Sequence, residues 1–475
     1  MLLQRFYDDG LAQASYLIAC QATGDAVVVD PNRDVDQYVR AAEVDGLRIS
    51  YVTETHIHAD FVSGSRELAD RTGARLLLSA EGGADWSYRF AAEAGARLLT
   101  DGESFSVGRV RFGVMHTPGH TPEHLALSVT DGAASDRPMG VLTGDFLFVG
   151  DVGRPDLLER AAGETGTMAV HARTLFRSLR AFAGLPDYLQ IWPGHGAGSA
   201  CGKSLGAVPQ TTLGYEKLTN WAFQVSDETA FVRDVLEGQP EPPRYFAQMK
   251  RINRDGPALL GRLDPPPRLP ASRLAPLLDQ NALIVDTRHA GDFAEGFVRR
   301  TINIPLNRSF TTWAGSLIPY DRPFYLIASD DDDRAISKAA RSLALIGLDK
   351  LGGYFGPEAV SALRGAMATI PQMSARDLAS RLASNGIRVL DVRTLAEWQT
   401  GHIPGAVHVP LVELEHRISE LDNTRPTVVQ CQSGSRSAIA SSLLAARGFE
   451  RVFNLVGGID AWTGGGGAVD RDDTA

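Results

Sequence analysis

Short apolar runs alternate with amphipathic stretches along the first part of the chain. The apolar runs at 25–31, 48–56 and 74–80 have the length of buried strands. The stretches at 34–46 and 63–73 show helical periodicity, and each ends at a glycine. Strands that alternate with helices in this way predict an α/β fold with buried sheets.

An internal repeat occupies the second half of the chain. Residues 283–306 match residues 389–411, and residues 322–337 match residues 425–440. Asp286 and Arg288 of the first copy correspond to Asp391 and Arg393 of the second, at an offset of 105 positions. The repeat predicts two related domains of roughly 100 residues each, following a larger N-terminal unit.

Breaks in the pattern give the expected domain boundaries. The Pro-rich stretch at 262–270 continues neither a helix nor a sheet, which makes it the best linker candidate. The end of the chain is rich in Gly and Asp and is expected to fray. We expect a first domain at 1–250, a first repeat domain at 251–370, a second repeat domain at 371–465 and a flexible tail at 466–475.

Composition narrows the classes of function. The chain has 475 residues, of which 44% are hydrophobic and 22% charged, as in ordinary globular proteins. Its net charge of −10 argues against a general nucleic-acid-binding surface. Neither a membrane-spanning apolar run nor a signal-peptide pattern occurs, and three cysteines are too few for a disulfide framework. We therefore expect a cytoplasmic protein with no membrane or nucleic-acid partner.

Histidines and aspartates cluster at the ends of predicted strands in the first domain. The motif THIHAD supplies one group, HTPGHTPEH a second, TGD a third and PGHG a fourth. Any one histidine can be a surface or core residue, but the joint pattern indicates a site for a divalent transition metal. The residues concerned are His56, His58, Asp60, His116, His120, His124, Asp145 and His195. Of these, His116 is expected beside the metal rather than on it, and His124, like His171, is expected to be an ordinary histidine.

At these motifs residues 10–200 resemble the metallo-β-lactamase superfamily, close to its glyoxalase II branch. The resemblance implies an αββα sandwich of two mixed sheets. One position departs from the family pattern, because Phe61 stands where the usual HxHxDH motif has its last histidine. Phenylalanine has no lone pair for a metal, so His58, Asp60 and His195 are expected to form a second shell or a vestigial second metal site.

The persulfide dioxygenase branch of this superfamily binds a single iron(II) through two histidines and one aspartate. By resemblance these ligands are His56, His120 and Asp145, with one Fe(II) per chain and zinc as the alternative metal. Such a set leaves open positions for a substrate and O₂.

Two further residues are candidates for contact with the substrate. Arg154 follows Asp145 on a loop and could hold an anionic group, or form a surface salt bridge instead. Cys201 lies six residues after His195 on a Gly/Ala/Ser loop. It could bring a thiol to the metal cleft, or be a buried inert cysteine.

A cysteine loop between a strand and a helix marks the last repeat. Its backbone N–H groups and a helix N-terminus would stabilise an anion or a persulfide on the cysteine. The loop consists of Cys431, Gln432, Ser433, Gly434, Ser435 and Arg436.

Residues 373–465, with this CxxGxR loop, resemble the rhodanese sulfurtransferases. The resemblance implies that Cys431 carries the transferred sulfur, that residues 432–435 cradle it and that Arg436 adds a cation. A rhodanese-like phosphatase is the competing interpretation, although such phosphatases generally have a longer loop. In the first repeat Ala328 replaces the cysteine and residues 329–333 read SDDDD, so we expect a degenerate rhodanese domain without sulfur-transfer activity.

The two resemblances together imply a persulfide dioxygenase fused to a sulfurtransferase, as in bacterial sulfide detoxification. The metal domain would oxidise a low-molecular-weight persulfide with O₂ to sulfite, and Cys431 would transfer sulfur to sulfite to give thiosulfate. One alternative is a binuclear zinc, glyoxalase II-like thioester hydrolase fused to a sulfurtransferase. Another is a sulfur carrier with a vestigial metal domain. The family resemblance also implies a homo-oligomer.

Overall fold

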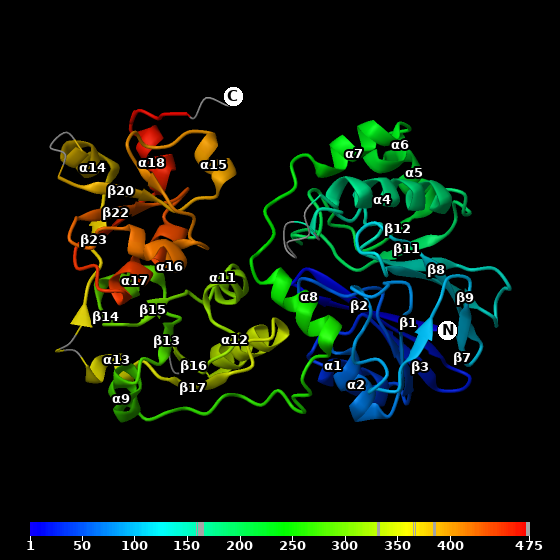
Figure 1. Cartoon of the computed structure of the whole chain (residues 1–475). Helices are drawn as coiled ribbons and strands as arrows, with labels where there is room; N and C mark the ends of the chain where they lie inside the picture. Colours follow the sequence, from blue (N-terminus) through cyan, green and yellow to red (C-terminus); the bar gives the residue numbers. More distant parts are fainter. Residues whose placement is uncertain are drawn as a thin grey trace. The chain divides into compact units, whose positions relative to one another are not determined.

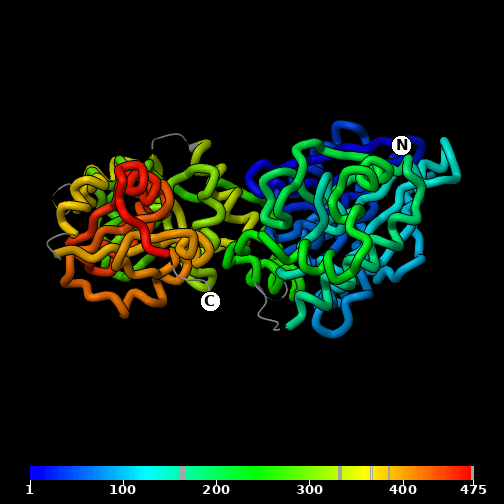
Figure 2. Tube along the Cα trace, turned by 90° about the horizontal axis from the view of Figure 1, so that it is seen from above, coloured from blue at the N-terminus to red at the C-terminus, as the bar shows by residue number. Residues whose placement is uncertain are grey.

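The structure is a computed structural model that describes the chain except residues 158, 160–165, 330–332, 364, 366, 383–385 and 472–475. The chain divides into two compact units. The first contains Met1–Leu263 and Arg341–Gly347, and the second contains Asp264–Ala340 and Leu348–Ala475. Figure 2 follows the chain by colour, from blue at the N-terminus to red at the C-terminus. The boundary at Leu263 lies inside the Pro-rich stretch.

Two six-stranded sheets form the core of the first unit. The first sheet has the order β1-β2-β3-β4-β5-β6, and the second has the order β12-β11-β10-β9-β8-β7. Both sheets mix parallel and antiparallel pairs. Their strands are β1 (Leu2–Asp8), β2 (Gln13–Cys20), β3 (Asp25–Val29), β4 (Arg48–Thr53), β5 (Arg75–Ser79), β6 (Arg97–Leu99), β7 (Ser104–Val107), β8 (Val110–His116), β9 (Leu125–Asp131), β10 (Gly140–Gly144), β11 (Gln190–Pro193) and β12 (Thr211–Thr212).

Helices cover the outer face of each sheet (Figure 1). Tyr38 and Leu68, from the first two helices, pack against the first sheet, whereas Leu175 and Leu179 pack against the second. The helices of this unit are α1 (Asp36–Val44), α2 (Ser65–Thr72), α4 (Met168–Phe182), α5 (Leu213–Thr219), α6 (Trp221–Gln224), α7 (Glu228–Leu236) and α8 (Phe246–Asp255).

The two sheets pack face to face because successive side chains of a strand point to opposite faces. In β2, Tyr16 and Ile18 join the core between the sheets, where they meet Phe112 and Leu127 of the second sheet. Their neighbour Leu17 points the other way, into the layer beneath α1 and α2. The arrangement is the αββα sandwich that the motifs predicted, and the expected strands and helices of residues 25–80 are confirmed.

Four strands of this unit end just before a predicted metal-site motif. β4 ends at Thr53, ahead of THIHAD, and β8 ends at His116, the first residue of HTPGHTPEH. β10 and β11 run parallel, and they end at Gly144 and Pro193. A rigid sheet edge thereby brings loops from distant parts of the sequence together.

The second unit contains the two repeats, and their sheets have the same strand order. The first repeat has the order β15-β13-β16-β17, and the second has β21-β20-β22-β23 with β19 added at the edge. The shared strand order shows that the two repeats resemble each other in fold as well as in sequence. The strands are β13 (Leu283–Asp286), β14 (Phe297–Val298), β15 (Ile302–Asn303), β16 (Phe324–Ile327), β17 (Leu351–Phe355), β18 (Met367–Ala368), β19 (Gln372–Met373), β20 (Arg388–Asp391), β21 (Val407–His408), β22 (Thr427–Gln430) and β23 (Val452–Leu455).

Short helices connect these strands. They are η1 (Ala271–Arg273), α9 (Leu274–Asp279), α10 (Ala290–Glu295), α11 (Phe310–Leu317), α12 (Asp333–Leu345), α13 (Glu358–Ala362), α14 (Ala375–Leu382), α15 (Leu395–Gln399), α16 (Leu414–Arg417), η3 (Ile418–Glu420), α17 (Ser435–Ala446) and α18 (Gly458–Gly464). Within the described residues, none of the helices combines the length and the apolar character that crossing a membrane requires.

The end of the chain is more ordered than its composition predicted. Asp470 exchanges two backbone hydrogen bonds with His402, of 2.8 and 2.9 Å. The indole N–H of Trp462 donates to the carbonyl oxygen of Ala468 at 2.8 Å. The expected flexible tail is therefore bonded over 466–471, because backbone pairing replaces the side-chain packing that its composition lacks. Residues 472–475 lie outside the described residues.

Candidate functional site

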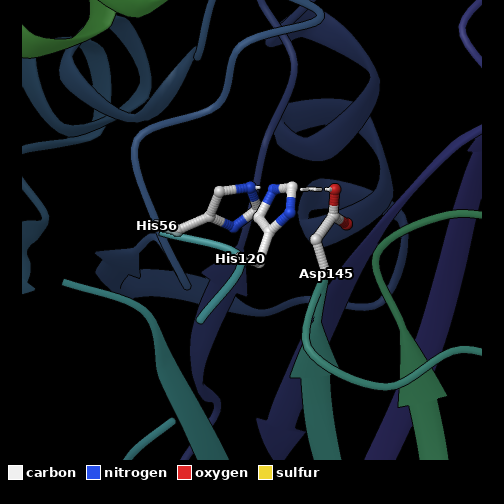
Figure 3. A group of neighbouring side chains, drawn as sticks. All are labelled: His56, His120 and Asp145. Atoms are coloured by element: carbon white, nitrogen blue, oxygen red, sulfur yellow. Dashed lines mark ion pairs between the residues drawn. The ribbon is translucent and has the colours of Figure 1, made fainter. Parts of the chain in front are cut away.

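Two histidines and one aspartate converge at the sheet edge of the first unit. The ligand atoms of His56, His120 and Asp145 all lie within 4.8 Å of one another. Nε2 of His56 is 3.8 Å and Nε2 of His120 is 3.6 Å from Oδ2 of Asp145. Figure 3 shows the two rings and the carboxylate pointing toward one another. The structure thus brings together the three residues that the sequence proposed as metal ligands.

The hydrogen bonds behind the two rings leave their Nε2 atoms available. Nδ1 of His120 lies 3.1 Å from the carbonyl oxygen of Arg154, which can only accept, so Nδ1 carries the proton. Nδ1 of His56 lies 2.9 Å from the hydroxyl of Thr55, and that hydroxyl donates to Asp30. Among the described residues, Nε2 of His56 and Oδ2 of Asp145 are buried without a hydrogen-bond partner. This donor set fits a divalent metal.

Burial and charge favour the ligand forms of these groups. Burial lowers the pKa of His56 well below its usual value and also lowers that of His120, which keeps both rings neutral. Burial raises the pKa of Asp145, but His195 and the other histidines outweigh this and hold it well below its usual range. Neutral imidazoles and an ionised carboxylate are the states that bind a metal.

Glycine is required next to Asp145. Gly144 has a φ of +48°, a conformation that L side chains rarely adopt. A Cβ at Gly194 would lie 2.7 Å from Oδ1 of Asp145. The glycines of TGD and PGHG therefore give the carboxylate its position and its space.

A second cluster lies beside the first. Nδ1 of His195 is 2.6 Å from Asp145 Oδ1, and its Nε2 is 2.8 Å from Asp60 Oδ2. The ligand atoms of Asp60, His195 and Cys201 lie within 4.8 Å of one another. Burial raises the pKa of the Cys201 thiol, and the charges of Asp60 and Asp145 raise it further. Cys201 is thus a buried, protonated thiol next to the metal cluster.

His58 lies outside both clusters. Its Nε2 is 3.2 Å from Asp30 Oδ1, and its ring packs against Phe61 with centroids 4.4 Å apart. Burial lowers the pKa of His58, but Asp30 and the other nearby carboxylates outweigh it and raise the pKa to about 9. Phe61 is fully buried at the position where the family pattern has a histidine.

Arg154 differs from the expected contact with a substrate. Its side chain is fully buried, and Nε and Nη2 donate to the two oxygens of Asp156 at 2.8 and 2.7 Å. Nη1 donates to the carbonyl oxygen of Ala200 at 3.0 Å. A guanidinium whose donors are directed at protein oxygens holds the Asp145 and Cys201 loops together, and is not directed at an open cleft.

Sequence reasoning missed the residues that support these ligands. Glu123 and His124 are fully buried and hydrogen-bond to the backbone beside His56 and Asp145. The signal in the sequence was a glutamate and a histidine directly after the candidate ligand in the motif HTPGHTPEH. Nε2 of the half-buried His116 lies 2.7 Å from the carbonyl oxygen of Pro122, and His116 belongs to neither cluster.

The cysteine loop of the second unit joins β22 to α17. The Sγ atom of Cys431 accepts the N–H of Gly434 at 3.1 Å and lies 3.5 Å from the hydroxyl of Ser437. Gly434 has a φ of +106° and precedes the first residue of α17. The loop therefore aims a backbone N–H at the sulfur. Ser437 is a contact that the sequence did not single out.

Arg436 is paired with a carboxylate. Its Nη1 and Nη2 donate to the two oxygens of Glu397, at 2.6 and 2.5 Å. Glu397 also accepts from Thr394 in a capping box at the start of α15. Partial burial raises the pKa of Glu397, but the hydrogen bonds from Arg436 and Thr394 outweigh it and lower the pKa to about 2. The bidentate pair fixes the end of the loop.

An Asp–Arg ion pair occurs at corresponding positions in both repeats. Arg393 Nη2 lies 2.7 Å from Asp391 Oδ2, and Arg288 pairs with Asp286 at the same distance. Ala328 is buried where the second repeat has its cysteine. The acidic run that follows falls at 330–332 outside the described residues.

The chain matches two known families. Residues 8–195 match the metallo-beta-lactamase superfamily and residues 374–464 match the rhodanese-like domain. A crystal structure of a metallo-beta-lactamase from Staphylococcus aureus subsp. aureus COL is 42% identical, with a TM-score of 0.67. That match covers 75% of this chain and 99% of the other.

Curated relatives match one part of the chain each. The putative sulfur carrier protein YrkF of Bacillus subtilis is 38% identical over 20% of this chain and 52% of its own length. The hydroxyacylglutathione hydrolase of Rhodospirillum rubrum is 30% identical over 38% of this chain and 60% of its own length. The mitochondrial persulfide dioxygenase ETHE1 of Bos taurus is 27% identical over 41% of this chain and 68% of its own length.

The chain thus spans about half to two thirds of the length of these relatives. The fold, the His/Asp cluster and the family matches indicate an enzyme with a divalent metal and a sulfur-transfer domain. The chain belongs to the metallo-beta-lactamase superfamily and carries a C-terminal rhodanese domain fused to its metal-binding domain.

Proposed function

We propose that this protein oxidises a low-molecular-weight persulfide at a single iron(II) and passes sulfane sulfur through Cys431. The observation that carries the proposal is the convergence of His56, His120 and Asp145, whose ligand atoms lie within 4.8 Å of one another. Two imidazoles and one carboxylate on one side of a metal are typical of non-haem iron(II) oxygenases. Phe61, at the adjoining position, removes a ligand of the usual second metal and supports a mononuclear centre.

Residues of the first unit would hold the metal, and their protonation states suit metal binding. Nε2 of His56 and of His120 and Oδ2 of Asp145 would bind it, with Arg154 O and Thr55 fixing the ring tautomers. Iron(II) supplies the redox chemistry with O₂ when it is bound. The balanced reaction is RSSH + O₂ + H₂O → RSH + SO₃²⁻ + 2 H⁺. Cys201, the buried thiol beside Asp60, would face the substrate from the second cluster.

The cysteine loop would carry out the second reaction. The Cys431 thiolate attacks the terminal sulfur of a second persulfide, the S–S bond of the donor breaks, and RS⁻ leaves: RSSH + Cys431–S⁻ → Cys431–S–SH + RS⁻. Sulfite then attacks the sulfane sulfur and releases thiosulfate, a proton and the Cys431 thiolate. The N–H of Gly434 and the N-terminus of α17 stabilise negative charge on the sulfur.

Relatives of both parts support the proposal. The ETHE1 relative is a persulfide dioxygenase, and the YrkF relative is a putative sulfur carrier protein. The hydroxyacylglutathione hydrolase relative favours a second candidate, a metal-dependent thioester hydrolase fused to the same rhodanese domain. In that case His56, His120 and Asp145 would hold a metal that supplies activation of water for hydrolysis of the thioester.

The two sites can be tested separately in the full chain. We expect iron-loaded protein to consume O₂ with a small-molecule persulfide, and His56→Ala to abolish this. The exposed His416 provides the control variant His416→Ala, which should keep full O₂ uptake. Thioester hydrolysis without O₂ uptake in the unaltered protein would contradict the dioxygenase and favour the hydrolase.

The products test the coupling between the sites. Cys431→Ser should release sulfite in place of thiosulfate at an unchanged rate of O₂ uptake. Cys20→Ser, at a buried cysteine on β2, should leave the thiosulfate yield unchanged. Unchanged thiosulfate output from Cys431→Ser would contradict sulfur transfer through this cysteine.

A further inference from the structure

The three metal ligands come from three separate loops, so their spacing depends on contacts between those loops. His56 follows β4, His120 follows β8, and Asp145 follows β10. The segment His120–His124 reaches both of the other loops. It does so through two side chains, Glu123 and His124, that are not ligands of the cluster.

Glu123 holds the backbone beside His56. Its carboxylate is fully buried, and Oε1 accepts the N–H of Ile57 at 2.7 Å. On the other side of His56, the N–H of Leu125 donates to the carbonyl oxygen of Thr55 at 2.7 Å. These two bonds bracket His56, so a shift of residues 123–125 would move its ring.

His124 holds the backbone of Asp145. Its Nε2 accepts the N–H of Asp145 at 3.1 Å, because a backbone N–H can only donate. Its Nδ1 lies 2.8 Å from the hydroxyl of Thr117, which fixes the ring from behind. The ring also stacks on His56, with centroids 5.0 Å apart and planes at 26°.

We infer that Glu123 and His124 are positioning residues for the metal centre. A single five-residue segment supplies one ligand, His120, and fixes the other two by hydrogen bonds to Ile57 and Asp145. The inference rests on the proposed metal site and adds residues that set its affinity and geometry. Loss of such a supporting bond typically weakens metal affinity about 10- to 100-fold.

The test uses Co²⁺ as the probe, with its dissociation constant measured by chelator competition and its coordination followed by the visible absorption spectrum. We expect Glu123→Ala to bind Co²⁺ about 10- to 100-fold more weakly and with an altered spectrum. Glu123→Gln should restore most of the affinity, because its amide oxygen can still accept from Ile57.

Glu216 provides a matched control in the same unit. It is equally buried and accepts the N–H of Gly150 at 2.9 Å and the side chain of Asn220 at 2.8 Å. Glu216→Ala therefore removes the same kind of bond from partners that are neither ligands of the cluster nor next to one in sequence. It should lower the thermal stability comparably and leave the Co²⁺ affinity and spectrum unchanged.

A second pair of variants tests the inference independently of Glu123. His124→Leu should weaken and distort Co²⁺ binding, whereas His124→Gln, with an acceptor oxygen near the position of Nε2, should retain more of it. Normal binding by the unaltered chain together with unchanged binding by Glu123→Ala and His124→Leu would overturn the positioning role alone. The proposed metal site itself would be overturned if the unaltered chain bound no Co²⁺. It would also be overturned if the His56→Ala variant bound Co²⁺ as tightly as the unaltered chain.

Discussion

At the scale of single residues, the candidate metal site depends on hydrogen bonds that leave the Nε2 lone pairs of its two histidines free. The carbonyl oxygen of Arg154 and the hydroxyl of Thr55 accept hydrogen bonds from the Nδ1–H groups of His120 and His56. Burial keeps both rings neutral, since it lowers the pKa of each. The orientation and protonation state of the ligand atoms are therefore set before a metal binds, which makes the free energy of metal binding more favourable.

Gly194 offers the first residue-scale prediction. Its substitution by alanine places a Cβ 2.7 Å from Oδ1 of Asp145, closer than real Cβ contacts allow. We expect Gly194→Ala to weaken Co²⁺ or Fe²⁺ binding about tenfold, in the range of other lost supports of a ligand. Gly464→Ala, where a Cβ meets nothing within 4 Å, is the control and should bind normally. Equal affinities in the two variants would contradict this account.

Glu397 gives a prediction for pH. Its pKa is about 2 in the folded chain against an ordinary 4.5, because its bonds to Arg436 and Thr394 outweigh burial. A lowered pKa contributes stability above about pH 4.5, and this contribution is lost as the pH falls toward 2. The difference in urea midpoint between the unaltered chain and Glu397→Gln should be largest at pH 7 and shrink between pH 4.5 and pH 3. A difference that stays constant with pH would contradict it.

At the scale of elements, α17 begins at the cysteine loop and fixes its shape. Gly434 immediately before the helix has a φ of +106° and donates its N–H to Cys431. Gly448, two residues after the helix ends at Ala446, has a φ of +89° with open space around it. Both glycines have a positive φ, but only Gly434 contacts the sulfur of Cys431.

These glycines form a matched pair of variants. Alanine at either position should cost about 1–2 kcal/mol of unfolding free energy, because both have left-handed backbones. Only Gly434→Ala should also lose sulfur-transfer activity, since the loop must relax away from Cys431. Both the denaturation midpoint and the rate of sulfur transfer are measured on the full chain. Equal activity in the two variants would show that loop geometry is unimportant for transfer.

Sequence pattern predicted the strands and helices of residues 25–80, whereas the groups that support the candidate ligands became visible only in the structure. Short apolar runs located β3, β4 and β5, because strands buried on both faces are apolar almost throughout. Helical periodicity located α1 and α2, because a helix buries one face. The roles of Glu123 and His124 depend on which loops meet across the sheet edge, and no local pattern carries that information. The sequence left Arg154 open between an anionic group of the substrate and a salt bridge, and the structure shows a buried salt bridge with Asp156.

At the scale of the whole molecule, one strand order occurs twice in the second unit, with different residues at the position of the cysteine. Both repeats contain an Asp–Arg ion pair at the end of a strand, Asp286–Arg288 and Asp391–Arg393. The first repeat has Ala328 in place of the cysteine and an acidic sequence after it. A repeat that has the ion pair but lacks the thiol fits a structural domain and not a second sulfur-transfer site.

The first repeat therefore has a definite expected behaviour. Ala328→Cys should fail to form a persulfide, because the carboxylates that follow repel an anionic donor and the CxxGxR loop is absent. Persulfide labelling and mass spectrometry of Cys431→Ser carrying Ala328→Cys would measure this. Labelling at position 328 comparable to that of Cys431 in the unaltered chain would contradict the assignment.

The most direct test of the central claim is the metal content of protein isolated without oxygen, measured together with O₂ uptake after addition of a small-molecule persulfide. The account predicts one iron per chain, bound through His56, His120 and Asp145, with O₂ consumed and sulfite or thiosulfate formed. Two zinc ions per chain, with no O₂ uptake and rapid anaerobic cleavage of a thioester, would contradict it.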